Sequence, residues 1–480
     1  MVSKKDFKKI NDWLWEIPKS YRSDMRVPAR VYISEKMLED LFRDRSMGQL
    51  INGTTLPGII KYGIAMPDCH EGYNVPIGFV GAIKISEGVI SPGACGFDIN
   101  CGVRLLKSEH NVGEINPHLD RLATEIQRRV PSGLGKGRET KLSIEQINKI
   151  LEQGTHVLLK QGYGEKEDVG NCEASGRLDW ADASVVSDRA KNRGRDQVGT
   201  LGSGNHFLEI QRVAEIFDEE IAKSFGLFED QVVIMIHTGS RGLGHQVCTD
   251  YLRTMIPAMQ RYGIKVPDKE FACVPFNSSE GQRYFAAMAS AANYAWANRY
   301  MIAHYIRKAW RKILGEKEKL ELLYDVAHNI IKKEKHKIDG EDTEIIVHRK
   351  GATRAFPPNH PEIPEKYKKV GQPVLIPGSM GTASYILVGS KDGAEAWYST
   401  CHGAGRTMSR KEATRTISGQ EVVNQLKQKG IIIKCRSIRG IAEEAPLAYK
   451  DVDSVVEVVH SAGLSKKVVK LVPLAVIKGE

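Results

Sequence analysis

The chain has 480 residues, of which 41% are hydrophobic and 27% are charged. These fractions are close to the averages for globular proteins, so they exclude a disordered chain and a fibre. Lysine and arginine number 69 against 59 aspartates and glutamates, which leaves a net charge of +10. Such an excess suits a polyanionic partner, nucleic acid or nucleotide phosphates, although a basic surface without a partner would give the same composition.

No feature of the sequence indicates a membrane or secreted protein. No apolar run approaches the ~20 residues that a transmembrane helix needs, and the basic N-terminus lacks the apolar stretch of a signal peptide. Eight cysteines are too few for a disulfide scaffold in a chain of this length. We therefore expect no membrane partner and a cytoplasmic location, or a nuclear one if the source is a eukaryote.

In the first 200 residues, short apolar runs alternate with helical patterns. Residues 13–18 are predicted to be irregular, and the spacing of apolar residues over 34–45 predicts an amphipathic helix. Residues 161–200 are polar and rich in glycine, aspartate and arginine, which is typical of a long loop or an exposed insertion. The other elements predicted here are strands at 77–85 and 103–106 and helices at 118–129 and 143–160.

The longest predicted element is a helix over residues 281–314. It is rich in alanine and aromatic residues, with apolar side chains on nearly every face, which predicts a buried helix. Around it we predict short strands at 207–210, 232–236, 345–348, 374–376 and 384–388, and alternating short helices and apolar runs up to 472–477.

Together these elements predict a mixed α/β chain of the α+β class. No fixed-period repeat, low-complexity tract or Pro/Ser linker divides the sequence. We expect a single large catalytic domain over residues 1–480, with short strands, Gly-rich active-site loops and surrounding helices. A helical and polar insertion is expected at about 118–195.

Seven loops, of which all but 325–329 contain glycine, carry the residues that could perform chemistry. Glycine lets the backbone approach a ligand closely and leaves N–H groups free for phosphate oxygens. One such loop is weak evidence, but seven, most with histidine, aspartate or cysteine, are hard to explain as ordinary turns. They span residues 66–72, 96–102, 202–207, 237–242, 325–329, 377–381 and 401–406.

One group of these residues predicts a metal site. Asp98 and Cys101 lie three apart in one loop, where a turn would bring both side chains to one face. His206, His237 and His328 are the natural imidazole partners, and carboxylate, thiolate and imidazole together suit a divalent transition metal. A thiolate can bridge two ions, and two-metal sites recur in phosphoryl and nucleotidyl transfer. The alternative is a turn-capping aspartate beside a buried thiol.

His402 has a different setting. Gly403, Ala404 and Gly405 follow it, and then Arg406 and Arg410. A histidine beside a phosphate-cradling loop and two arginines is a candidate nucleophile toward phosphorus. Asp68 could hold the other ring nitrogen and so fix the tautomer. The alternative is a helix-capping histidine.

A basic run over residues 348–354 has no acidic interruption. Together with Arg241, Arg406 and Arg410 it could grip a nucleic-acid backbone. The alternative is a solvated basic hairpin.

A Lys-x-Asp-Gly match at Lys337 is discounted. That core is typical of lysine-nucleophile ligases, but here it lies between charged runs that are typical of a solvated hairpin tip.

The ordered series of loops resembles the RtcB family of RNA ligases. The similarity runs from about residue 25 to Lys478. One departure from the common pattern is Asn100, where many members carry glycine. The motifs that carry the resemblance are residues 66–70, 96–102, 199–207, 237–242, 348–354, 377–381 and 401–406.

The resemblance implies a GTP- and Mn²⁺-dependent ligase that joins RNA 3′-phosphate or 2′,3′-cyclic phosphate ends to 5′-hydroxyl ends. It implies His402 as the residue that becomes guanylylated, with transfer of GMP to the RNA 3′-phosphate and attack by the 5′-hydroxyl as the later steps. Asp98, Cys101 and His206 would hold one Mn²⁺, and Cys101, His237 and His328 the other, with Cys101 bridging.

The same resemblance implies the substrate contacts and the partners. RNA, as tRNA exon halves or broken RNA, and GTP would be the substrates, and an archaease-like activating protein is a further expected partner. The RNA contacts would be Arg241, Arg349, Lys350, Arg406 and Arg410. The GTP contacts would be Asn205, Phe207, Glu209, Asn329, Pro377, Gly378, Ser379, Met380, Ser384, Gly403, Ala404, Gly405, Tyr449 and Lys478.

Two functions of other classes stay open at this point. One is a metal-dependent phosphohydrolase that uses two metals without a covalent histidine. The other is a non-catalytic RNA-binding subunit, which would have no need of metal ligands or of His402.

Overall fold

The computed structural model describes residues 2–133, 137–268, 271–435 and 437–479. Within these ranges the N-terminal strands and one later hairpin form a seven-stranded sheet. Its β3–β4 pair is parallel and its other pairs are antiparallel. In spatial order the strands are β1 (Lys8–Asn11), β2 (Leu14–Ile17), β3 (Ala29–Tyr32), β4 (Ile59–His70), β5 (Ile77–Lys84), β13 (Glu341–Lys350) and β12 (Asn329–Ile338).

A second sheet contains the C-terminal strand β19 (Ser465–Lys478) as one of its interior strands. Its main path is antiparallel throughout, and β18 (Ile432–Lys434) adds to β19 in parallel. Two small sheets pair β6 (Val89–Ile90) with β10 (Val274–Pro275) and β14 (Ala352–Arg354) with β17 (Ser399–Cys401). In spatial order the main path is β11 (Glu321–Ala327), β7 (Gly102–Asn111), β9 (Gln231–Thr238), β8 (Phe207–Ile216), β19 (Ser465–Lys478), β16 (Ser384–Gly389) and β15 (Pro373–Ile376).

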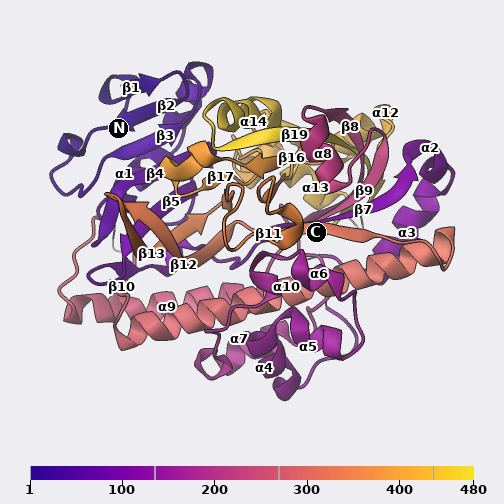
Figure 1. Ribbon diagram of the computed structural model, residues 1–480, viewed down its shortest axis with the longest axis horizontal. Helices are drawn as coiled ribbons and strands as arrows, with labels where there is room; N and C mark the ends of the chain where they lie inside the picture. Colours follow the sequence, from indigo (N-terminus) through magenta and orange to yellow (C-terminus); the bar gives the residue numbers. More distant parts are fainter. Residues whose placement is uncertain (1, 134–136, 269–270, 436, 480) are drawn as a thin grey trace.

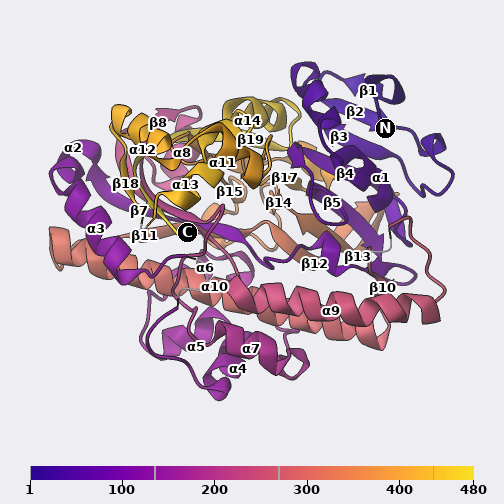
Figure 2. The same cartoon turned by 180° about the vertical axis from the view of Figure 1, so that it is seen from behind.

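The helix α10 (Ser279–Leu314) runs along the molecule below the sheets, with α9 (Arg241–Arg261) beside it (Figure 1). It begins at the Ser278 cap, whose hydroxyl accepts a hydrogen bond from the Gly281 N–H, and it ends before Gly315. Seen from behind, α4 (Ile144–Gln153) and α5 (Thr155–Lys160) lie against the side of α10 that faces away from the sheets, and α7 (Asp188–Gly194) packs against α9 (Figure 2). No described helix is both long enough and apolar enough to span a bilayer.

The other α-helices are shorter than α9 and α10. The structure gives their bounds as α1 (Ser46–Gly53), α2 (Val112–Ile115), α3 (Leu119–Arg129), α4 (Ile144–Gln153), α5 (Thr155–Lys160), α6 (Glu167–Gly170), α7 (Asp188–Gly194), α8 (Glu219–Phe225), α11 (Arg410–Thr416), α12 (Gly419–Gln428), α13 (Arg439–Glu443) and α14 (Val452–Ser461).

The α+β class is confirmed, and so is the buried helix over 281–314, but four local predictions need correction. Residues 13–18 are not irregular, because Leu14–Ile17 pairs with a strand on each side. The 34–45 helix is a 3₁₀-helix, Glu35–Phe42. The 143–160 helix breaks at Gly154, whose φ is 54°. The 161–200 loop contains short helices, and residues 134–136 of the proposed insertion lie outside the described residues.

Candidate active site and metal centre

The predicted ligands meet where the ends of several strands of the second sheet lie side by side, because neighbouring strands are antiparallel and their ends are in register. The end of β11 (Ala327), the start of β7 (Gly102) and the end of β9 (Thr238) are paired across the sheet. In the same way His237 pairs with Phe207, at the start of β8, and Phe207 with Lys478 at the end of β19. His237, near the end of β9, therefore comes close to Cys101, His206 and His328, which lie directly beside the ends of β7, β8 and β11.

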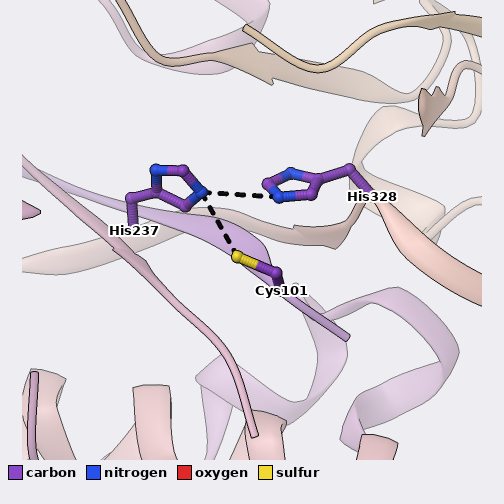
Figure 3. Close-up of side chains that lie close together, drawn as sticks. All are labelled: Cys101, His237 and His328. Atoms are coloured by element: carbon purple, nitrogen blue, oxygen red, sulfur yellow. Dashed lines mark hydrogen bonds between the residues drawn. The ribbon is translucent and has the colours of Figure 1, made fainter. Parts of the chain in front are cut away.

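Cys101 lies at the centre of two overlapping groups of ligand atoms. Its Sγ is 3.4 Å from Nε2 of His206 and 3.4 Å from Nε2 of His237. On one side His206 Nε2 is 2.8 Å from Asp98 Oδ2. On the other, His237 Nε2 is 3.4 Å from His328 Nε2, and Figure 3 shows the Cys101, His237 and His328 side chains turned toward one another. Within each group the ligand atoms lie within 4.8 Å of one another.

The protonation of these residues fits a metal site. Burial lowers the pKa values of His237 and His328 well below the ordinary value, so both rings are neutral and able to donate a lone pair. Burial opposes ionisation of Asp98, but His206 brings its pKa down to about 2. Burial and the Asp98 charge raise the pKa of the Cys101 thiol, and a coordinated cation would remove that proton. The donor set is therefore one that suits a divalent transition metal.

His402, which follows β17, and Asp68, which lies in β4, form a close pair. His402 Nδ1 lies 2.5 Å from Asp68 Oδ2, and the same oxygen accepts from the backbone N–H groups of His402 and Gly403 at 2.9 and 3.1 Å. Burial opposes ionisation of Asp68, but His402 lowers its pKa overall. With Nδ1 held by the carboxylate, the lone pair of His402 is left on Nε2. Its ring centroid is 4.9 Å from that of His328, beside the metal ligands.

A cavity opens beside His402, and most of the predicted nucleotide contacts line it. His237 also lines it, so the cavity reaches the metal ligands. Among the predicted contacts its wall contains Asn205, Phe207, Pro377, Gly378, Ser379, Met380, Gly403, Ala404, Gly405, Tyr449 and Lys478.

Three predicted nucleotide contacts do not line this cavity. Glu209 is fully buried two residues after Phe207, on the same face of β8. Gln211 Nε2 donates to Glu209 Oε2 and also to the Ser384 hydroxyl, at 2.7 and 3.0 Å. Asn329 instead supports the loop 96–102, which carries Asp98 and Cys101, because its Nδ2 donates to the backbone oxygen of Asp98 at 3.1 Å.

The cavity wall also contains residues to which the sequence analysis gave no role: His70, Ile77 and Glu444. Glu444 is 2% exposed, and its Oε1 is 3.3 Å from Arg406 Nη1 and 3.3 Å from Arg410 Nε. The Tyr449 hydroxyl donates to the same carboxylate. Glu444 thus joins three predicted substrate contacts, but it lies outside every Gly-rich motif, so no local signal could have found it.

The predicted RNA contacts separate into two sets. Arg406 and Arg410 line the cavity, and Arg241 begins α9 next to the metal ligands. Arg349 and Lys350 instead need correction, because both are buried in β13.

Their donors are also occupied. Arg349 pairs with the buried carboxylate of Glu334 and donates to the Ser399 hydroxyl at 2.9 Å. Lys350 donates to the backbone oxygens of Tyr73 and Val75. Neither side chain can reach an RNA phosphate, and both brace the interior.

Lys337 lies where the sequence predicts it, near the tip of the β12–β13 hairpin. Its side chain is 76% exposed, and its Nζ lies 3.4 Å from Oδ1 of Asp342, which is 71% exposed.

Comparison with known proteins gives one consistent result. A family model described as tRNA-splicing ligase RtcB matches residues 49–479. The tRNA-splicing ligases RtcB of Thermococcus kodakarensis and Archaeoglobus fulgidus are 51% and 52% identical over 476 residues, which is 98% of this chain and of each relative. The RNA-splicing ligase RtcB of Mycobacterium tuberculosis is 50% identical over 434 residues, which is 90% of this chain and 100% of that protein.

Proposed function

Because this chain belongs to the RtcB family of tRNA-splicing ligases, it is an RNA ligase, and we propose that it uses GTP and Mn²⁺. It joins RNA that ends in a 3′-phosphate or 2′,3′-cyclic phosphate to RNA with a 5′-hydroxyl. A 3′-phosphate is a poor electrophile, so it must be activated before the hydroxyl can attack. The cyclic phosphate is first hydrolysed to the 3′-phosphate.

In the proposed reaction the free Nε2 of His402 attacks the α-phosphorus of GTP, and the bond to pyrophosphate breaks. An oxygen of the RNA 3′-phosphate then attacks the same phosphorus, and the N–P bond to His402 breaks. Finally the 5′-hydroxyl oxygen attacks the RNA 3′-phosphorus, and GMP leaves. Asp68 holds Nδ1–H throughout, which keeps the nucleophilic nitrogen facing the cavity.

The metal ligands have a supporting role in this proposal. Asp98, Cys101 and His206 would hold one Mn²⁺, and Cys101, His237 and His328 the other. Two such cations neutralise charge that builds up on phosphoryl oxygens.

The cavity supports the proposed nucleotide site. The backbone N–H groups of Ala404 and Gly405 suit phosphate oxygens, and the Tyr449 ring suits stacking on a base. Arg406 and Arg410, both beside Glu444, would receive the RNA phosphates. An archaease-like activating protein is a further proposed partner.

The observation that carries this proposal is the Asp68–His402 pair directly beside the metal ligands and the cavity. The test is incubation with α-labelled GTP and Mn²⁺, followed by mapping of the labelled residue. We expect label on His402 and release of pyrophosphate. Hydrolysis of GTP or of the RNA phosphate without protein labelling would instead favour the two-metal phosphohydrolase. The absence of both labelling and hydrolysis would favour a non-catalytic RNA-binding subunit.

Replacing Glu209 by Gln should lower GTP use and narrow the preference for GTP over ATP. Guanine presents N1–H and an N2 amino group as adjacent donors, whereas adenine presents an N1 acceptor. The Glu209 Oε1 is buried without a hydrogen-bond partner among the described residues, and burial raises the pKa of this carboxyl to about 8. Guanine would supply the missing donors, and discrimination of this kind can reach ~10⁴-fold.

Competition between GTP and ATP, scored by histidine labelling, measures the effect. Glu215→Gln is the matched control, because Glu215 is an exposed glutamate on the same strand. It should leave selectivity unchanged, and both variants should keep normal Mn²⁺ occupancy. Unaltered selectivity in Glu209→Gln would show that guanine is read elsewhere.

A further inference from the structure

One buried side chain of α10 contacts the backbone next to two proposed metal ligands. Arg299 is fully buried, and its Nη1 donates to the backbone oxygens of Asn100 and Thr238, each at 2.8 Å. Asn100 immediately precedes Cys101, and Thr238 immediately follows His237. A single nitrogen atom therefore joins the two segments that supply Cys101 and His237.

The same guanidinium also contacts the strand that leads to the third ligand. Arg299 Nε lies 3.0 and 3.1 Å from the two carboxylate oxygens of Asp325, and Nη2 lies 2.8 Å from one of them. Asp325 is fully buried in β11, three residues before His328. All three segments that supply the Cys101, His237 and His328 group thus meet at one arginine.

The Asn100 side chain strengthens this connection. Its Oδ1 accepts from Arg299 Nη2 at 2.9 Å, and its Nδ2 donates to the backbone oxygen of Ala292 at 2.7 Å. The φ of Asn100 is 53°, in the left-handed region that asparagine tolerates better than most residues. The loop before Cys101 is therefore tied to α10 by both backbone and side chain.

The ligands need such support from the backbone. A metal-binding histidine is usually oriented by a hydrogen bond to its second ring nitrogen. Nδ1 of His237 is buried and has no partner among the described residues. The orientation of the His237 ring therefore depends on the position of its backbone. Arg299 fixes that position by donating to the backbone oxygen of the next residue, Thr238.

From these contacts we propose that Arg299 is a positioning residue for the metal centre. It holds the three ligand segments at the spacing that lets Cys101, His237 and His328 share one ion. The inference rests on the metal set of the proposed function, and it concerns metal affinity rather than contact with RNA or GTP.

The test is Arg299→Lys. Lysine keeps the positive charge but offers a single nitrogen, which cannot reach Asn100, Thr238 and Asp325 together as a planar guanidinium does. We expect Mn²⁺ affinity to fall by about 10- to 100-fold, the usual effect of losing an outer contact of a metal site. Equilibrium dialysis with Mn²⁺ alone measures it, and the thiolate absorption of the Co²⁺-loaded protein reports on Cys101.

Arg307→Lys is the matched control. Arg307 lies eight residues further along α10, is 3% exposed, and pairs with both carboxylate oxygens of Asp168 at 2.7 Å. Its Nε donates to the backbone oxygen of Leu320, away from the metal ligands. The Arg307→Lys variant should have a lower melting temperature, as expected when a buried arginine is replaced, but its Mn²⁺ affinity should be unchanged.

The outcomes separate the inference from general instability. Weaker binding in Arg299→Lys alone supports the inference, whereas wild-type affinity in that variant, or equal weakening in both, overturns it. If Arg299→Lys does not fold, Asp325→Asn decides. Asparagine keeps the size of the side chain on β11 but removes the carboxylate that pairs with Arg299, so reduced affinity supports the inference and unchanged affinity overturns it. Absence of metal from the wild-type protein would instead contradict the proposed function.

Discussion

His402→Ala should abolish labelling of the protein by α-labelled GTP and reduce ligation of 3′-phosphate RNA by at least about 10⁴-fold, the scale on which loss of a covalent nucleophile acts. His70 also lines the cavity, but its Nδ1 contacts the backbone oxygen of Asp68, whereas His402 contacts the Asp68 carboxylate. The variant should still seal an RNA end that has already been guanylylated, because the last step does not use the nucleophile.

Labelling gels and ligation of the two RNA forms measure these effects. Lys337→Ala serves as the control, since this exposed lysine near the hairpin tip should be dispensable. Label retained on the His402 variant, or mapped to Lys337, would refute the histidine assignment.

Cys101→Ser should reduce ligation more than the change of any single histidine ligand. The Sγ atom belongs to both groups of ligand atoms, whereas each histidine belongs to one. A serine hydroxyl is neutral at pH 7 and does not bridge two cations as a thiolate does. The loss should therefore exceed the roughly 10- to 100-fold expected from an outer contact, and the bound Mn²⁺ should fall below two ions per chain.

Metal analysis beside ligation rates checks this prediction. Cys95→Ser is the matched control, because Cys95 is also buried and lies in the segment just before the metal loop, yet belongs to neither ligand group. It should keep normal metal content. Two bound ions and near-normal ligation in Cys101→Ser would rule out a bridging role.

The sequence by itself determined the features that are encoded over short distances. The uninterrupted apolar surface of 281–314 predicts a buried helix because period and burial are local properties, and α10 is that helix. The apolar runs at 77–85 and 232–236 became β5 and β9 for the same reason. Local composition also identified the ligand types and the Gly-rich loops that carry them.

Local pattern failed where a segment had too few residues to show a period or was interrupted by glycine. Residues 14–17 form a strand only because β1 and β3 lie on either side. The long helix α9 was not predicted. Two of its first four residues are glycines and it contains Pro257, and both residue types disfavour a helix.

The tertiary structure alone decided which distant residues meet. Cys101 and His237 are brought together by the register of β7 on β9, and no spacing along the chain encodes that register. From the sequence, Arg349 was predicted to belong to a basic RNA-binding surface. In the structure it is buried and pairs with the buried carboxylate of Glu334, because a buried charge must be paired. Arg299 gave no sequence signal for the same physical reason: its three contacts come from segments more than 20 residues away, and only folding places them around one guanidinium.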